Sequence, residues 1–198
     1  MTDLRPDNRH RLVTATAGLF LRRGYHGTGL KEITETSRAP VGSLYHHFPG
    51  GKEELAAEAL RVAADGYEGV VAAVIDSAPD VASGIRVSFA AAAEVLRLSD
   101  YADACPIATV ALEVASTNER LRLVTGAIFE GWTEMLAMRL RSAGLDAVPA
   151  REIALTYLAA LEGGFLLCRA AKSTEAMDAV GRFVADRVDA ALAEADSR

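Results

Sequence analysis

A stretch near the N-terminus, residues 24–55, reads GYHGTGLKEITETSRAPVGSLYHHFPGGKEEL. It predicts two short helices, Leu30–Ser37 and Val41–Phe48, separated by a turn of about three residues. Pro40 disfavours helix in the residue before it and suits the start of the second helix, where its missing N–H costs nothing. The Pro-Gly-Gly run at 49–51 ends that helix. Two short helices with this spacing are typical of a helix-turn-helix.

Helix signals continue on both sides of this motif. An amphipathic helix is expected from Asp7 to Arg23, Thr28 is expected to cap the next one, and a long helix is expected from Lys52 to Ala78. Further helices are expected at 80–99, 107–115, 116–144, 149–171 and 173–195, with Asp80 and Ser116 as caps and Pro149 as an opening residue. No stretch alternates strictly between apolar and polar residues. The sequence therefore predicts an all-α fold of about nine helices, divided into domains at 7–60 and 61–198.

Composition narrows the class of protein. The 198 residues are 51% hydrophobic, enough to bury a core. No window reaches the roughly 18 uncharged apolar residues of a membrane span, and the N-terminus, with Asp3 and Arg5, lacks the apolar run of a signal peptide. Cys105 and Cys168 have no Cys or His nearby at ligand spacing, so we expect two buried free thiols, no metal and no cofactor. We expect a cytoplasmic protein that does not contact a membrane.

Charge is unevenly distributed along the chain. The net charge is −6, yet residues 1–60 carry eight Lys and Arg against seven Asp and Glu, together with all four histidines. The remainder carries thirteen basic against twenty acidic residues. An acidic body behind a locally basic head is compatible with DNA binding through the head alone.

The second short helix carries an unusual set of polar groups. Gly42 allows close approach of DNA to the backbone, while Ser43, Tyr45 and His46 offer hydrogen-bonding groups. Lys52 combines a side-chain charge with the free N–H groups at the start of the next helix, which suits a phosphate. Packing over a small core would explain any one of these residues alone. DNA binding is favoured instead by three polar aromatic residues that lie together between two helix breakers: Tyr45, His46 and His47.

The same run resembles the DNA-binding signature of the TetR family of regulators, most specifically in LYHHF at 44–48 followed by Lys52. The FPGGK variant and the segment ACPIATVALE at 104–113 resemble the LmrA/YxaF-type branch of that family. The resemblance implies a three-helix DNA-binding head on a helical body. That body would dimerise and hold a ligand pocket, and the protein would bind palindromic operators and usually repress.

Carried over by position, the resemblance assigns DNA contacts to seven residues. They are Thr28, Lys31, Gly42, Ser43, Tyr45, His46 and Lys52. Tyr45 and Lys52 are expected to contact phosphates, and Ser43 and His46 to reach base edges. Val41 departs from the pattern because many relatives carry Lys or Arg there; it removes a charge and can contact a thymine methyl group.

In the body, large apolar residues recur at helical spacing, which fits either an ordinary core or an apolar ligand pocket. The resemblance favours the pocket. The candidate lining residues are Phe89, Cys105, Leu112, Phe129, Trp132, Met135, Leu136, Leu158, Leu161 and Phe165. Glu113 and Glu162 lie on apolar helical stretches and need a partner, and whether they line the pocket stays open.

The last two helices are candidates for a dimer interface. They carry Gly163 and Gly164, with Leu166, Leu167, Val180, Phe183, Val184 and Val188 as apolar surface. Such a helix pair can pack against its two-fold copy as a four-helix interface, and packing within one chain is the alternative.

The sequence does not indicate an enzyme, since no nucleophile and base, metal cluster or phosphate loop is present. We expect a DNA-binding homodimeric regulator, a repressor released from a palindromic operator by a small apolar or aromatic effector. A helical ligand-binding or adaptor protein that has lost DNA binding is the alternative, suggested by the acidic balance and Val41. The operator, the regulated genes and the effector are not encoded in any motif, and activation in place of repression stays open.

Overall fold

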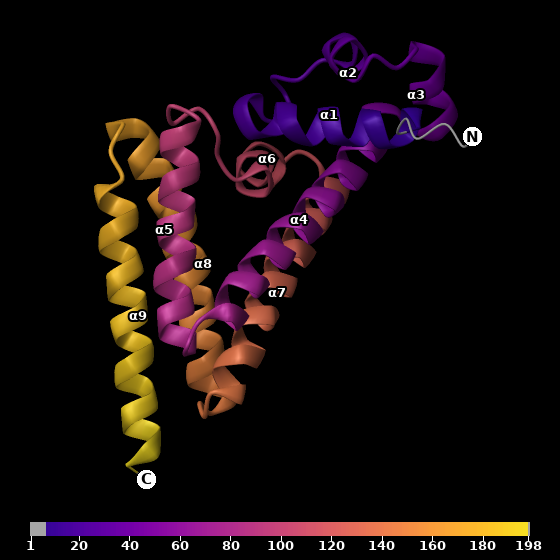
Figure 1. Cartoon of the computed structure of the whole chain (residues 1–198). Coiled ribbons are helices and arrows are strands. Elements are labelled where there is room, and N and C mark those ends of the chain that lie inside the picture. Colours follow the sequence, from indigo (N-terminus) through magenta and orange to yellow (C-terminus); the bar gives the residue numbers. More distant parts are fainter. Residues whose placement is uncertain (1–6, 198) are drawn as a thin grey trace, which may run out of the picture. The chain divides into compact units, whose positions relative to one another are not determined.

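The computed structural model describes residues 7–197, which form nine α-helices and no strand (Figure 1). The prediction of an all-α fold is therefore confirmed for this part of the chain. Asp3 and Arg5 of the charged N-terminus lie outside it. The helices are α1 (Asn8–Arg23), α2 (Leu30–Ser37), α3 (Val41–His47), α4 (Gly51–Ser77), α5 (Val81–Leu98), α6 (Pro106–Val114), α7 (Glu119–Ser142), α8 (Ala147–Ala171) and α9 (Glu175–Asp196).

Side-chain caps explain where several helices begin. The carboxylate of Asp7 accepts a hydrogen bond of 2.7 Å from the His10 N–H at the start of α1, and Asp80 caps α5 in the same way, as predicted. The predicted cap of α7 at Ser116 is wrong. Asn118 caps that helix by accepting a 2.9 Å hydrogen bond from the Leu121 N–H, because the helix starts later than the Ser-x-x-Glu spacing suggested.

Helix α8 begins at Ala147, two residues before the predicted opening at Pro149. Proline is tolerated there because the first N–H groups of a helix have no carbonyl partner within the helix. Proline near a helix start therefore located the first turn of α8 but not its first residue. By length and composition α8 is the one described helix that is apolar enough to cross a membrane. Core helices of soluble proteins meet the same criteria, and α8 packs against α5 and α9.

The chain forms two compact units. Within the described residues, the first comprises those up to 65 together with 105–128, and the second comprises 66–104 together with those from 129 onward. Helices α4 and α7 each contribute to both units. This differs from the division at residue 60 expected from the sequence, because α6 packs against α1 and so joins the N-terminal helices.

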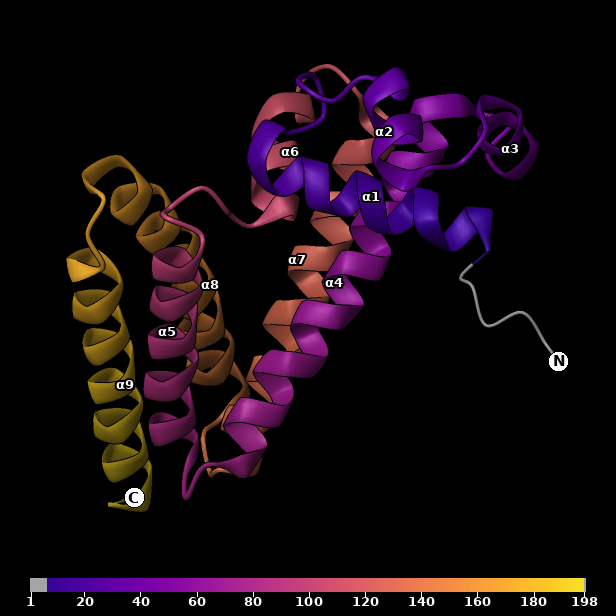
Figure 2. The ribbon, with the colours of Figure 1, turned by 45° about the horizontal axis from the view of Figure 1, so that its top comes forward.

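The core of the first unit is assembled by α1, α2, α3 and the start of α4 (Figure 2). Leu44 and Phe48 point into it, together with Leu12 of α1, Ile33 of α2 and Leu55 of α4. Because the short helices α2 and α3 share one apolar cluster with the longer α1, their relative positions are fixed by packing. That arrangement leaves the opposite face of α3 in solvent.

Close packing against α9 organises the second unit. A Cβ added to Gly181 of α9 would lie 2.7 Å from the Phe89 Cβ of α5, and one added to Gly164 of α8 would lie 2.9 Å from the Met177 sulfur. These glycines let the helix backbones approach closely. Val184 and Val188 are fully buried here, so their prediction as apolar surface is wrong.

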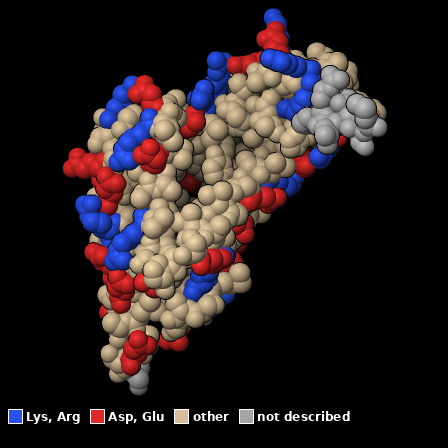
Figure 3. Space-filling model, in the orientation of Figure 1, with Lys and Arg blue, Asp and Glu red and all other residues tan. Residues whose placement is uncertain are grey.

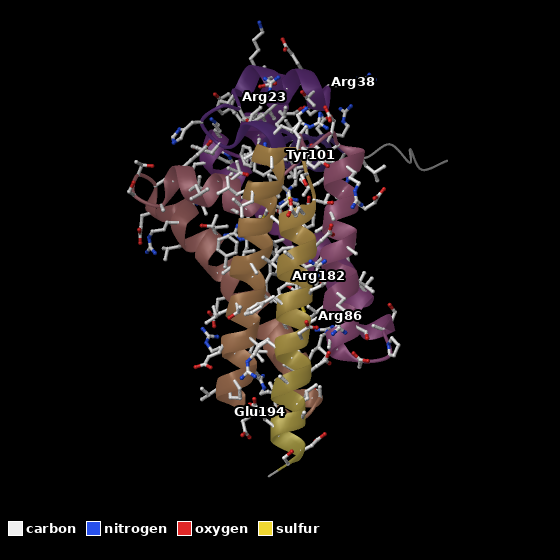
Figure 4. All side chains as sticks on the ribbon, turned by 90° about the vertical axis from the view of Figure 1, so that its left-hand side faces the viewer. Arg23, Arg38, Arg86, Tyr101, Arg182 and Glu194 are labelled. Atoms are coloured by element: carbon white, nitrogen blue, oxygen red, sulfur yellow. The ribbon has the colours of Figure 1, made fainter. Side chains whose placement is uncertain are left out.

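Charged groups lie along the outside of this helix group. Arg86 of α5 reaches α9, where it donates to Asp186 at 3.0 Å and Asp189 at 2.6 Å (Figure 4). Figure 3 shows Lys and Arg interleaved with Asp and Glu on this part of the surface. Exposed ion pairs of this kind contribute about 1 kcal/mol or less each, so packing of apolar and small residues holds α5, α8 and α9 together.

Candidate nucleic-acid interface

The turn between α2 and α3 has the three residues that the sequence predicted, Arg38 to Pro40. Arg38 adopts the left-handed conformation, with φ of 54°. The Ser37 hydroxyl accepts a 3.2 Å hydrogen bond from the Ala39 N–H, and the Pro40 carbonyl accepts one of 2.9 Å from the Ser43 N–H. The local contacts therefore define the direction in which α3 leaves the turn.

The outer face of α3 carries the predicted contact residues. Val41 is 57% exposed and Tyr45 is 52% exposed, and Gly42 and His46 are exposed as well. A Cβ on Gly42 would meet nothing within 4 Å, so packing does not require glycine at this position. Because Gly42 has no side chain, the backbone of α3 is accessible to a binding partner at this position. Covering the local core, the alternative role for Tyr45 and His46, does not fit this exposure.

Thr28 does not belong to this face. Its side chain is fully buried and its hydroxyl donates a 2.7 Å hydrogen bond to the Gly24 carbonyl. Gly29 occupies the N-cap position of α2, without a side-chain cap. The predicted cap at Thr28 is therefore wrong, and its side chain is not accessible to a phosphate. Lys31, by contrast, is exposed, with its ammonium 3.8 Å from the Glu35 carboxylate.

Lys52 lies in the first turn of α4, and its ammonium nitrogen is 4.2 Å from the centre of the Tyr25 ring. Partial burial lowers the pKa of Lys52, and the nearby Glu113 carboxylate opposes that shift. Burial also raises the pKa of Tyr25, an effect to which Glu53 adds. The Lys52 charge is thus held at a defined place beside the α1–α2 turn.

Glu113 of α6 contacts the same turn. Its carboxylate accepts a 2.8 Å hydrogen bond from the His26 N–H, although the two residues are 87 positions apart. Gly24 has φ of +66°, and a Cβ there would lie 2.1 Å from a Glu113 carboxylate oxygen. The positive φ of residue 24 favours glycine, and the Glu113 carboxylate fills the space that a side chain there would need. The sequence indicated that Glu113 needs a partner without identifying one, and the structure shows that this partner is the His26 N–H.

Arg38 is a candidate DNA contact that sequence reasoning missed. It lies exposed in the turn between α2 and α3 (Figure 4) and forms no ion pair with a described residue. The sequence signal was its place between the two predicted helices. Nothing in the sequence indicated that a non-glycine residue would take the left-handed conformation and direct a cation outward.

Eight of the ten predicted pocket residues lie in the second unit. Phe89, Met135 and Leu136 are buried in its core, and the Phe129 and Trp132 rings meet edge to face at 6.0 Å. Leu158, Leu161 and Phe165 are half-buried. The other two, Cys105 and Leu112, belong to the first unit.

Cys105 and Leu112 have different surroundings from the other eight. Cys105 is a buried free thiol, as is Cys168, and its sulfur accepts a hydrogen bond from the Ala108 N–H at the start of α6. Leu112 is 84% exposed. Glu162 of α8 is half-buried, and its charge adds to the burial that raises the pKa of Tyr157. Apolar spacing along a helix therefore did not separate buried positions from surface positions.

Family models match both parts of the chain. The model described as "Bacterial regulatory proteins, tetR family" matches residues 12–59. The model for "Transcriptional regulator LmrA/YxaF-like, C-terminal domain" matches residues 81–183.

Curated relatives agree with these matches. The chain is 33% identical to the HTH-type transcriptional regulator LmrA of Bacillus subtilis, over 85% of this chain and 89% of that one. It is 32% identical to the uncharacterized HTH-type transcriptional regulator YxaF of the same organism, over 82% and 85% of the two chains.

Solved structures have the same fold. A TetR transcriptional regulator from Legionella pneumophila superposes with a TM-score of 0.80 at 21% identity, covering 92% of this chain and 98% of that one. A cysteine mutant of the TetR family regulator CifR, complexed with 26bp double-strand operator DNA, superposes with a TM-score of 0.78 at 23% identity, covering 92% and 97%.

Proposed function

Because this chain belongs to the TetR family of transcriptional regulators, in its LmrA/YxaF-like branch, and is a DNA-binding regulator, we propose that it is a repressor released from its operator by a small apolar or aromatic effector. The observation that carries the DNA half of this proposal is the outer face of α3. Val41, Gly42, Tyr45 and His46 stay exposed there while Leu44 and Phe48 anchor the helix from beneath.

On this proposal, the residues of the head divide into two roles. Tyr45 and Lys52 hold phosphates and so position α3 without reading sequence. Lys31 of α2 and Arg38 of the turn before α3 add positive charge, and this charge attracts the DNA backbone. His46, Ser43 and Val41 reach base edges in the major groove, where donors, acceptors and the thymine methyl group distinguish the base pairs.

On this proposal the protein is a homodimer, and the second copy of the chain supplies a second α3, which we call the recognition helix because it reads the DNA. Leu166 and Leu167 of α8 and Phe183 of α9 are all exposed, and Phe183 is 68% so. Large apolar side chains on two adjacent helices favour an isologous four-helix interface. Two heads would then bind the half-sites of a palindrome, with recognition helices about 34–36 Å apart or a multiple of that distance.

The effector is proposed to bind in the second unit, among Phe89, Phe129, Trp132, Leu158 and Phe165. Two features support communication with the head. Helices α4 and α7 each run through both units, and Glu113 attaches α6 to the α1–α2 turn beside Lys52. An effector that prefers the non-binding conformation lowers operator affinity, and by reciprocity operator DNA lowers effector affinity by the same factor.

We place the protein in the cytoplasm, without a cofactor and without an enzymatic activity of its own. The relatives named above, which are transcriptional regulators, support this placement. A regulator of this kind needs access to DNA and to a diffusible effector.

A gel-shift titration of the full chain on the DNA upstream of its own gene tests the DNA half. Tyr45→Phe and Lys52→Ala are each expected to weaken binding about tenfold on specific and non-specific DNA alike, because phosphate contacts do not read sequence. Lys172→Asn is the control for loss of a lysine, since Asn tolerates the left-handed backbone of that residue in the second unit. If Lys52→Ala altered base preference while non-specific affinity stayed intact, the phosphate role would be wrong.

Trp132 provides the test for the effector half, because it is the single tryptophan of the chain. Its fluorescence should respond to a compound that releases the operator, and Trp132→Ala should impair release more than DNA binding. A compound that releases the operator yet binds equally well to free and DNA-bound protein would contradict the mechanism, since equal affinity for two states shifts neither.

A further inference from the structure

The first residue of α1 contacts the recognition helix. The side-chain nitrogen of Asn8 donates a 2.9 Å hydrogen bond to the Ser43 hydroxyl oxygen. The guanidinium of Arg11 in turn donates to the side-chain oxygen of Asn8. The contact therefore joins two helices through three polar side chains.

Arg11 determines which way the Asn8 amide faces. A guanidinium can donate hydrogen bonds but cannot accept them, so the oxygen end of the amide must point toward Arg11. The NH₂ end must then point toward Ser43. The orientation of an asparagine amide is assigned from its hydrogen-bonding partners, and here Arg11 leaves one choice.

The orientation of Asn8 has a consequence for Ser43. A hydroxyl has one hydrogen to donate and two lone pairs that accept. Because Asn8 presents N–H groups, Ser43 can only accept from it, and the Ser43 hydrogen is left for another acceptor. Other hydroxyls of the first unit donate back to helix carbonyls: Thr16 to Leu12 at 2.8 Å and Thr34 to Lys31 at 2.8 Å. Ser43 lies in the first turn of α3, where the Pro40 carbonyl accepts from the Ser43 N–H, and the Ser43 hydroxyl donates to no carbonyl of the described residues.

We propose that Asn8, oriented by Arg11, is a positioning residue that makes Ser43 a hydrogen-bond donor toward DNA. The inference rests on the DNA-binding function of α3 and adds a direction to one of its contacts. At this position the protein selects a DNA acceptor: a phosphate oxygen, or N7 or O6 of guanine, N7 of adenine or O4 of thymine in the major groove. The amino group of cytosine, a donor, is disfavoured there.

Asn8→Asp is a nearly isosteric test of this role. A carboxylate accepts from both Arg11 and Ser43, so it takes the Ser43 hydrogen and leaves lone pairs facing the DNA. The substitution is compatible with α1, because an acidic residue is favourable in the first turn of a helix. Circular dichroism and thermal unfolding of each variant check that the head stays folded.

The negative charge that Asn8→Asp introduces also repels DNA, so the measurement uses a double-mutant cycle. Full-length wild type, Asn8→Asp, Ser43→Ala and the double variant are compared on a randomised duplex library and on the best wild-type sequence. When Ser43 is present, Asn8→Asp should lower the affinity for DNA about tenfold more than it does when Ser43 is replaced by Ala. A change of base preference at one position identifies a base edge as the acceptor, and a uniform loss identifies a phosphate.

Equal losses in the two backgrounds would overturn the role of Asn8, because charge repulsion alone acts without Ser43. Binding to the randomised duplex library requires only that the protein binds DNA. The result therefore still holds if the protein does not respond to an effector. A wild-type chain that enriched no sequence would contradict DNA reading by α3 itself, and the proposal with it.

Discussion

Both units pack around an apolar core, and they differ in the contacts that supplement it. In the first unit, polar side chains connect residues far apart in sequence: Asn8 with Ser43, Glu113 with His26, and Asn118 with Glu53 at 2.7 Å. In the second, glycines and apolar side chains dominate the contacts of α9 with α5 and α8. Directional contacts suit a unit that must present a few exposed groups to DNA, whereas close packing suits a unit whose proposed ligand is apolar.

The largest effect is expected from Gly24→Ala in the first unit. A side chain there is strained by the backbone and displaces the Glu113 carboxylate from the His26 N–H. We expect a loss of about 2–4 kcal/mol in the free energy of unfolding, from backbone strain and a lost charge-assisted hydrogen bond. Denaturant unfolding measures the loss, and hydrogen exchange should increase in the α1–α2 turn and in α6.

Gly18→Ala is the matched control. Gly18 lies in α1, and a Cβ there would meet nothing within 4 Å. Alanine should stabilise that helix by about 0.5–1 kcal/mol. Equal stability changes at the two glycines would contradict the attachment of α6 to the turn.

A smaller loss is expected from Gly181→Ala in the second unit. The new methyl group must displace Phe89, and overpacking of this kind costs about 1–3 kcal/mol, partly offset by the higher helix propensity of alanine. Gly131→Ala on α7, where a Cβ would meet nothing within 4 Å, is the control. A Gly181→Ala protein as stable as the control would show that α5 and α9 are not closely packed.

The smallest effect concerns the Tyr157–Ser88 pair, whose oxygens are 2.9 Å apart in the second unit. Tyr157→Phe should cost about 1 kcal/mol at neutral pH, the value of one hydrogen bond. Burial raises the pKa of Tyr157 above its unfolded value of about 10. Its stabilising effect is therefore full below about pH 10 and is lost as pH rises toward the folded pKa. Urea unfolding from pH 8 to 11 should show a steeper alkaline loss for wild type than for Tyr157→Phe; parallel curves would contradict the burial of the phenol.

The head was largely predictable because its functional residues break the packing pattern. Tyr45 and His46 lie between helix breakers and are too polar for a small core, and the structure leaves both of them and the neighbouring Gly42 exposed. Thr28 was misjudged because its hydroxyl has a local backbone acceptor in Gly24. The contact between Glu113 and His26 was out of reach, since no local pattern identifies a partner 87 residues away.

The second unit was less predictable for a physical reason. Helical spacing identifies the apolar side of a helix but not what covers that side. Val188 was expected at the surface and is buried, whereas Leu112 was expected in a pocket and is exposed. Which apolar residues line a ligand site depends on how three or more helices meet, and this information is absent from any single helix.

Footprinting of the full chain on the DNA upstream of its own gene tests most directly whether α3 reads DNA as one of a pair. We expect protection of two symmetric half-sites, each spanning a few base pairs of major groove. His46→Ala should change the preferred bases inside both half-sites, and Lys52→Ala should weaken protection without changing them. Protection of a single asymmetric half-site by a monomer, or an unchanged base preference in His46→Ala, would contradict this interpretation of α3.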